Sequence, residues 1–387
     1  IWAAGAIAAS VFVFWRYLCA PTHGRLVLAA LTLGAALLTK YTALALYPLL
    51  GITALVFHAA WIGAQLRARD EASLRRAARR AIAATAVILT LSGLVVNAGF
   101  LFDRTGTPLR GYTFRSRTFR TIRRRAGALS ALPLPLPYPY LEGLDWVVQR
   151  GRTGEGYGSI YLRGELRQGR GFPGYYLWAS LYKMPLGTLA MSIAGLVGLG
   201  LALRRGVSLQ HEWPLIIPLI FFGVYFNFFY RAQIGIRYFL VAMPLLYVLA
   251  SRVASSVRRR RQFVPITLAV VWSWGSMLSF FPHFLPYTNE LIPDRRLAYR
   301  VFADSNLDWG QHVWYFERYM AEHPDTIVEP AGPTPGTIAV GVNALTGVAG
   351  EPDRFRWLRD HFTPIDHVAH AVLLYRISPG DLRRVQP

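Results

Sequence analysis

The chain has 387 residues, of which 53% are hydrophobic and 16% charged, and its formal net charge is +21. Soluble domains carry about 25% charged residues, and several runs here approach or exceed the roughly 18 apolar residues of a transmembrane helix. Composition therefore excludes an ordinary soluble enzyme and indicates a polytopic membrane protein. The arginines fall mainly between apolar runs and no zinc-type or RNA-binding signature occurs, so we expect no nucleic acid as partner and contact with anionic membrane lipids instead.

Eight apolar segments follow one another along the chain, at about 1–20, 25–40, 43–66, 81–102, 184–203, 213–230, 236–256 and 263–286. They predict a mainly α-helical fold: a polytopic transmembrane bundle with a long outer loop and a small C-terminal α/β soluble domain. The boundary at Thr39-Lys40-Tyr41 is either a tight hairpin or a kink. No charged region or cleavage site precedes the first segment, so it is not a signal peptide, and we expect the chain to start part-way through a longer membrane protein.

Short basic loops predict the orientation of the chain. Three of them carry arginines: Arg67, Arg69, Arg75, Arg76, Arg79 and Arg80; Arg204 and Arg205; Arg252 with Arg258 to Arg261. The positive-inside rule makes all three loops cytoplasmic. We then expect transmembrane helices over 1–103 and 183–286, an extracytoplasmic loop over 104–182 and an extracytoplasmic domain over 287–387. The chain is thus predicted to cross a membrane several times.

One outer stretch departs from this rule because it is strongly basic. It holds Arg115, Arg117, Arg120, Arg123, Arg124 and Arg125, with Phe114, Phe119 and Ile122 between the charges. The rule weakens for loops longer than about 60 residues. Two interpretations stay open: a solvated basic loop, or an interfacial segment that grips lipid phosphates.

Further along the outer loop, alternating prolines over 132–140 favour an extended, polyproline-like conformation. Tyrosines beside glycines at 161–165 and 171–176 could stack on sugars or form an interfacial aromatic belt.

The tail reads as a small folded domain. A helix is expected over 306–320, strands over 337–342 and 371–377, and a short helix near 355–361. His361, His367 and His370 lack zinc-ligand spacing, so no metal site is expected.

The stretch from Asp304 to Gln311, Asp-Ser-Asn-Leu-Asp-Trp-Gly-Gln, crowds polar groups at a lipid boundary. Ser305 and Asp308 fit a capping box, which would account for both without any chemistry. It leaves other side chains to line a site for a charged headgroup or a sugar: Asp304, Asn306, Trp309, Gln311 and His312.

Three basic residues stand out from the rest. Lys40 and Lys183 are the only lysines among 42 basic residues, and each adjoins a tyrosine at the outer end of an apolar segment. Arg237 begins an apolar segment on the same face. A compact ammonium is a good partner for phosphate, and arginine grips phosphate as a fork. The alternative for all three is snorkelling at a helix end.

Taken in order, these stretches resemble the bacterial membrane glycosyltransferases of family 39 type, relatives of the protein O-mannosyltransferases in the GT-C superfamily. The resemblance covers most of the chain, and its most specific part is 304–311. The other stretches that carry it are 39–42, 132–140, 161–165, 175–186 and 235–240. It implies transfer of a sugar from a polyprenyl-phosphate carrier, the donor substrate, to an acceptor hydroxyl on a protein, lipid or glycan outside the membrane. Lys40, Lys183 and Arg237 would then face the carrier phosphate, with Asp304, Asn306, Asp308 and Gln311 on the sugar–acceptor side.

The chain departs from that family at the catalytic base. The family places an acidic residue in the first outer loop, and no such loop precedes the first segments here, so the base is unassigned. Asp103, Glu142, Asp304 and Asp308 are the remaining outer carboxylates. A second hypothesis is a non-catalytic GT-C-like membrane scaffold whose outer domain docks a partner protein. A transporter fits less well because the apolar segments carry few internal charges and no repeated halves.

Overall fold

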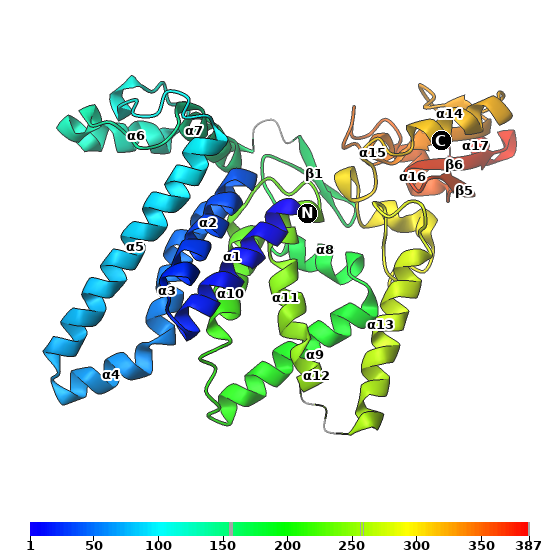
Figure 1. The fold of residues 1–387 in the computed structure, drawn as a ribbon. Helices are drawn as coiled ribbons and strands as arrows, with labels where there is room; N and C mark the ends of the chain where they lie inside the picture. Colours follow the sequence, from blue (N-terminus) through cyan, green and yellow to red (C-terminus); the bar gives the residue numbers. More distant parts are fainter. Residues whose placement is uncertain (155–157, 256, 258, 386–387) are drawn as a thin grey trace. The chain divides into compact units, whose positions relative to one another are not determined.

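The computed structural model describes residues 1–154, 158–255, 257 and 259–385 (Figure 1). The chain is mainly helical, with a two-stranded sheet within 159–168 and a four-stranded sheet within 327–377. It forms two compact units: unit 1 comprises 1–152, 195–225 and 239–249, and unit 2 comprises 153–194, 226–238 and 250–387. Arg258, one of the arginines of the third basic loop, lies outside the described residues.

Unit 1 is built around α1 (Trp2–Cys19), α2 (His23–Thr39), α3 (Leu46–Phe57), α4 (Ala59–Ala68) and α5 (Glu71–Gly99). Helices α2 and α5 approach closely at Gly34, where a Cβ would come within 2.6 Å of the Val95 Cβ. Tyr47 and Ser92 join α3 to α5 through a 2.7 Å hydrogen bond between their hydroxyls. Helix α2 ends at Thr39 because the backbone at Lys40 is extended. The boundary predicted at Thr39-Lys40-Tyr41 is therefore a break between two helical segments.

Three described helices are long and apolar enough to cross a membrane: α1, α5 and α9 (Leu186–Arg204). A fourth span results if 41–57 and α4, which bend by 55° at their junction, count as one. The other predicted segments contain shorter helices, α10 (Trp213–Val224), α11 (Met243–Ala250), α12 (Arg252–Ser255) and α13 (Phe263–Leu278). Helices long and apolar enough to cross a membrane are thus present, and the complete bundle stays a prediction.

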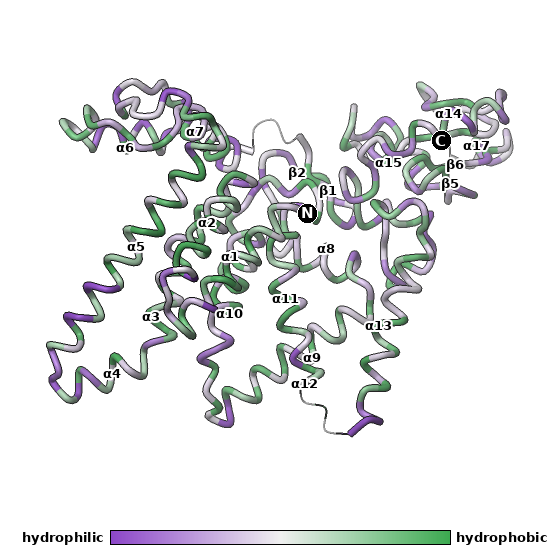
Figure 2. The backbone as a smooth tube through the Cα atoms, in the orientation of Figure 1, coloured by the Kyte–Doolittle hydropathy of each residue, from purple (hydrophilic) through white to green (hydrophobic). Residues whose placement is uncertain are grey.

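The first basic loop differs from its prediction because most of it is helical. Helix α5 begins at Glu71, where the Asp70 carboxylate accepts a hydrogen bond from Ser73 N at 3.0 Å. An exposed Glu71–Arg75 ion pair, 2.8 Å and one turn apart, supports this first turn. The helix therefore extends well beyond its apolar stretch, as its hydrophilic end in Figure 2 shows.

Unit 1 also contains α6 (Arg117–Ala126) and α7 (Tyr138–Thr153). The proline-rich stretch before α7 is non-helical over 132–137 and bends at Leu132, Pro135 and Leu136. Helix α7 begins at Tyr138, so the extended conformation predicted over 132–140 is wrong for 138–140. The buried Asn97 side chain of α5 donates to Pro135 O at 3.0 Å, so this stretch is fastened to the end of a candidate membrane span.

Unit 2 holds the hairpin β1 (Ser159–Leu162) and β2 (Glu165–Gln168), helix α8 (Tyr175–Lys183) and a four-stranded sheet. The sheet order is β3-β4-β6-β5, with β3 parallel to β4 and the other pairs antiparallel. Its strands are β3 (Ile327–Val328), β4 (Gly336–Gly341), β5 (Asp366–Val368) and β6 (Val372–Ile377). Strands β4 and β6 confirm the two predicted strands to within one residue at each end.

The remaining helices of the tail are α14 (Val313–Glu322), α15 (Val342–Leu345), α16 (Arg356–His361) and α17 (Pro379–Val385). Phe316 and Tyr319 of α14 pack against Ala339, Val372 and Leu374 of the sheet. Helix α16 confirms the predicted short helix. The expected start of α14 at Asn306 is wrong, because the chain forms a 3₁₀ turn over 304–306 and α14 begins only at Val313.

Candidate functional site

Side chains of the 3₁₀ turn over 304–306 bond two other segments of unit 2, the Tyr175 hydroxyl and the backbone of 234–236. The fully buried Asn306 side chain donates to the Tyr175 hydroxyl at 2.8 Å and accepts from Ile236 N at 3.1 Å. The Ser305 hydroxyl donates to Ile234 O. Ser305 therefore bonds the backbone of a segment distant in sequence and does not cap a helix, so the capping-box prediction is wrong.

Gly235 makes this close pairing possible. Its φ is +125°, a conformation that L side chains rarely adopt. A Cβ at this position would also collide with the Ser305 hydroxyl. The backbone of 234–236 can therefore lie directly against 305–306. This contact places the next residue, Arg237, beside the stretch 304–311, which is called the motif below.

Helix α8 is held at both ends by buried asparagines. At its start, Leu177 N donates to Asn227 Oδ1 at 3.0 Å. At its end, the Asn289 side chain donates to Leu181 O at 2.6 Å and to Met184 O at 2.7 Å. These bonds satisfy peptide groups that a helix end leaves open and fix the last residue of α8, Lys183.

Lys183 lies half-buried with its ammonium against backbone carbonyls. Nζ donates to Leu285 O at 2.9 Å and also to Asn306 O, which ties the lysine to the motif. Desolvation lowers the pKa of Lys183 to about 7. The ammonium can thus gain or lose its charge near neutral pH, and one of its three donors remains for an anion.

Arg237, Trp309 and Asp304 form the open part of the site. The Arg237 guanidinium lies over the Trp309 indole, 3.9 Å from the ring centre, and its charge acts on the Asp304 carboxyl. Trp309 is 59% exposed. A planar cation, a carboxylate and an accessible aromatic face together suit an anionic sugar-bearing ligand.

Asp304 carries backbone strain in addition to its charge. Its φ is +53°, the left-handed region that few residues other than glycine occupy. Burial raises the pKa of its carboxyl, and the Arg237 guanidinium opposes that rise. Asp304 Oδ1 accepts a bond from the next residue, Ser305 N, at 2.6 Å. Strained residues of this kind cluster at ligand sites.

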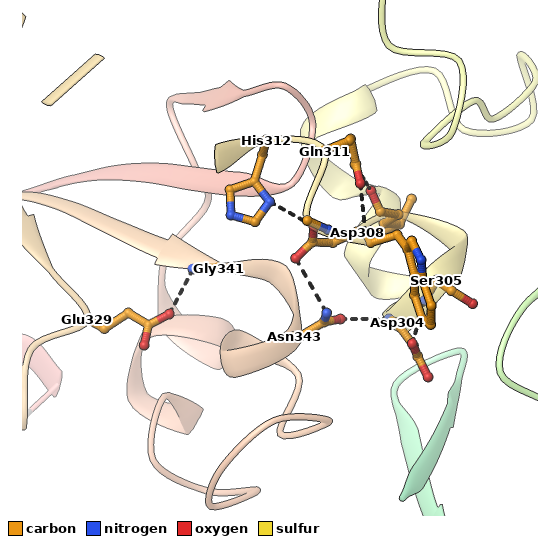
Figure 3. A network of polar contacts seen from close by, with 11 residues as sticks. Asp304, Ser305, Asp308, Gln311, His312, Glu329, Gly341 and Asn343 are labelled. Atoms are coloured by element: carbon orange, nitrogen blue, oxygen red, sulfur yellow. Dashed lines mark hydrogen bonds and ion pairs between the residues drawn. The ribbon is translucent and has the colours of Figure 1, made fainter. Parts of the chain in front are cut away.

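Asp308 lies in a closed polar network, drawn in Figure 3, with the Asp304 carboxylate pointing away from it. Asp308 Oδ1 accepts from Gly310 N at 2.9 Å and is 2.7 Å from His312 Nδ1. Asn343 joins the two aspartates: its Oδ1 accepts from Asp304 N at 2.7 Å, and its Nδ2 is 3.5 Å from Asp308 Oδ2. These bonds brace the loop.

Gln311 also bonds within the motif. Its side chain donates to Leu307 O at 2.8 Å and accepts from Trp309 N at 2.7 Å, so it positions the indole. Of the seven residues predicted for the site, the structure brings six together in unit 2: Lys183, Arg237, Asp304, Asn306, Asp308 and Gln311. Lys40 belongs to unit 1, at the C-terminal end of α2.

Two features of this region were not predicted from the sequence. Asn343 follows β4 and meets the motif only through the fold. A second feature is a cavity of about 440 Å³, lined by four arginines, two aspartates, two tyrosines and a glycine: Arg163, Arg300, Arg356, Arg359, Asp353, Asp360, Tyr161, Tyr299 and Gly164. Arg163 N, in the β1–β2 turn, donates to Val301 O at 2.9 Å, three residues before Asp304. Only the 161–165 stretch carried a signal, its tyrosine and glycine.

Within the described residues, no group of three or more His, Cys, Asp or Glu side chains could hold a metal ion. The cations and aromatic rings of the site can bind an anionic group and a sugar face, and Asp304 can accept a hydroxyl proton or hydrogen bond. No protein-family model, no curated protein and no solved structure matches the chain.

Proposed function

We propose that the protein is a membrane glycosyltransferase that moves a sugar from a polyprenyl-phosphate carrier to an acceptor hydroxyl on the extracytoplasmic face of a bacterial cytoplasmic membrane. Its fold would be a GT-C-like polytopic bundle. The observation that carries the proposal is the convergence of Arg237, Trp309 and Asp304 on a rigid loop that also binds Lys183.

The chemistry of the reaction asks for these groups. When the sugar leaves, the carrier phosphate gains a negative charge, which fixed cations stabilise more in the transition state than in the ground state. Arg237 and Lys183 supply such cations. The Trp309 face suits the apolar side of a sugar ring, and Asp304 accepts a hydrogen bond from a sugar or acceptor hydroxyl.

Asp304 is the carboxylate that we expect to matter most among those of the motif. Asp308 is occupied by His312, Gly310 and Asn343, whereas Asp304 keeps an oxygen for a ligand. A charge-assisted hydrogen bond contributes about 1.5–3 kcal/mol, so Asp304→Asn should lower kcat/KM about 10–100-fold. The measurement is sugar transfer from a polyprenyl-phosphate donor by the full-length protein.

The matched control for this variant is Asp103→Asn. Asp103 is an exposed outer carboxylate of unit 1, 3.6 Å from the guanidinium of its neighbour Arg104. Its loss should leave transfer within about twofold. Equal activities of both variants and the unaltered protein would contradict the role of Asp304, and absence of any transfer by the full-length protein would contradict the proposed function.

Lys183 should give donor binding a characteristic pH dependence. Because the pKa of Lys183 is lowered to about 7, its ammonium is charged below that pH and neutral above it, whereas the donor phosphodiester stays anionic. We expect donor affinity to fall about tenfold from pH 6.5 to pH 8.5, measured as KM or as retention of the lipid. Lys183→Arg stays charged over this range and should flatten the profile. An unchanged profile in this variant would assign the pH dependence to another group.

The alternative function is a non-catalytic scaffold. One observation favours it, namely that several polar side chains of the motif bond other protein groups. Three polar side chains of the motif make hydrogen bonds within unit 2 that hold the loop in place: Asn306, Asp308 and Gln311. A scaffold would keep these braces without any donor binding. Retention of a polyprenyl-phosphate sugar that depends on Arg237 separates the two functions, because only the enzyme requires it.

A further inference from the structure

Unit 1 contains a basic cavity that the proposed reaction does not use. Its volume is about 320 Å³, and it lies along α6 with one residue from the end of α7. Its lining is three arginines, two threonines and an isoleucine: Arg117, Thr118, Thr121, Ile122, Arg125 and Arg152. No acidic side chain lines it, so the cavity carries concentrated positive charge.

The cavity uses one face of α6. Arg117, Thr121 and Arg125 follow at intervals of four residues, which places them one above the other on a helix. Arg120 and Arg124 belong to the same helix but do not line the cavity. The arginines of this run are thus divided into two sets, and only one set faces the hollow.

The other face of α6 is fixed to an aromatic platform. Phe119 packs on Phe114, with ring centres 5.1 Å apart, and the Arg123 guanidinium donates to Tyr112 O at 2.7 Å. Tyr112 in turn stacks on Phe114 at 5.3 Å. Arg117 and Arg125 are therefore presented by an anchored helix, and this basic run is not an irregular loop.

The start of α6 is fixed by a buried carboxylate. Asp145 of α7 accepts hydrogen bonds from Arg115 N at 2.6 Å and from Ser116 N at 3.0 Å. The Ser116 hydroxyl then caps the helix by accepting from Phe119 N at 3.1 Å. Asp145 thus holds backbone groups and is not among the side chains that line the cavity.

Several groups in the cavity lack a partner. Thr118 Oγ1 is buried and makes no hydrogen bond within the described residues. A buried hydroxyl without a partner costs about 1–3 kcal/mol, so a ligand oxygen would relieve it. The described part of the chain also offers no acidic partner to the Arg117 and Arg125 guanidinium groups.

The surroundings of α6 indicate the depth of lipid headgroups. Helix α5, apolar and long enough to cross a membrane, ends at Gly99, 18 residues before α6 begins. Leu101 just beyond it is 88% exposed, and Ile122 at the cavity is 47% exposed. Basic and exposed apolar side chains side by side are typical of segments at a membrane interface.

We propose that this cavity binds the phosphate of an anionic membrane phospholipid. Arg117 and Arg125 grip the phosphate oxygens, Thr118 donates to one of them, and Ile122 lies along the start of the acyl chains. Such a lipid would anchor the outer loop at the end of α5, and it would explain why a run of arginines stands on the face where the positive-inside rule disfavours it.

The test is retention of phosphatidylglycerol by the full-length protein in mixed phosphatidylglycerol and phosphatidylcholine micelles, followed by native mass spectrometry. Arg117→Gln with Arg125→Gln should lower the affinity of the most tightly retained phosphatidylglycerol about tenfold, and Thr118→Val alone about threefold. Arg120→Gln with Arg124→Gln changes the net charge of the same helix equally and should leave retention unchanged.

Equal losses in both double variants would overturn the proposal, since they would show attraction to the net charge of α6 alone. Unchanged retention in Arg117→Gln with Arg125→Gln would overturn it as well. If 10 mM inorganic phosphate abolishes the retention that depends on Arg117 and Arg125, the cavity prefers free phosphate to a lipid, and this would also overturn the proposal. Thr118→Val keeps the test decisive if a double variant fails to fold, because it leaves every arginine in place.

Discussion

Replacing Arg237 by glutamine should lower kcat for sugar transfer by about 10²–10³-fold. The guanidinium is held over Trp309 at 3.9 Å by the pairing of 234–236 with 305–306, so it is positioned before the donor binds. Removing one preorganised group that stabilises developing charge costs this much in enzymes that depend on it. The loss should appear in kcat more than in KM, because the charge on the phosphate grows as the glycosidic bond breaks.

Two further variants make this prediction specific. Arg237→Lys keeps the charge but loses the planar fork and its stacking on the indole, so it should recover part of the activity. Arg231→Gln removes an exposed arginine from the same segment and should stay within about twofold of the unaltered protein. A kcat of Arg237→Gln within threefold of that control would show that Arg237 does not face the reacting phosphate.

The sequence predicted best what depends on local pattern. Strands β4 and β6 are short apolar runs with glycine or polar residues beside them. The sequence predicted the ends of both strands to within one residue. Helix α5 was placed too late in the chain, because the prediction followed hydrophobicity and overlooked that Asp70 and Glu71 start a helix. A helix that continues beyond its apolar stretch cannot be bounded by apolar content alone.

The site was predictable in its residues but not in their roles. Ser305 and Asp308 have the spacing of a capping box, yet the Ser305 hydroxyl donates its hydrogen bond to Ile234 O, 71 positions earlier in the chain. Asn343 carries no sequence signal, because its contacts with Asp304 and Asp308 arise from the end of β4 meeting a distant loop. Polar residues gathered within eight positions indicate an unusual loop, and only the fold divides them into braces and ligand-facing groups.

Asn306→Ala should destabilise the protein more than any other single change in the motif. The side chain is fully buried and joins Tyr175 to Ile236. Its loss leaves the part-buried Ile236 N–H without a partner and removes one hydrogen bond from the buried Tyr175 hydroxyl. An unsatisfied group costs about 1–3 kcal/mol and a lost hydrogen bond about 0.5–1.5 kcal/mol, so the free energy of unfolding should fall by about 2–4 kcal/mol. The unfolding midpoint in detergent, followed by intrinsic fluorescence, should fall by about 5 °C or more.

Gln311→Ala is the matched control because it removes the same amide group from the same loop. Its bonds reach only Leu307 and Trp309, its neighbours in sequence, and the side chain is partly exposed, so the loss should be below about 1 kcal/mol. Tyr175→Phe removes one of the two Asn306 bonds and should fall between these variants. Equal midpoints for Asn306→Ala and Gln311→Ala would show that Asn306 does not hold the loop. If Asn306→Ala lowers the midpoint and Arg237→Gln does not, Asn306 holds the loop, and a loss of activity in Arg237→Gln is then a loss of chemistry and not of folding.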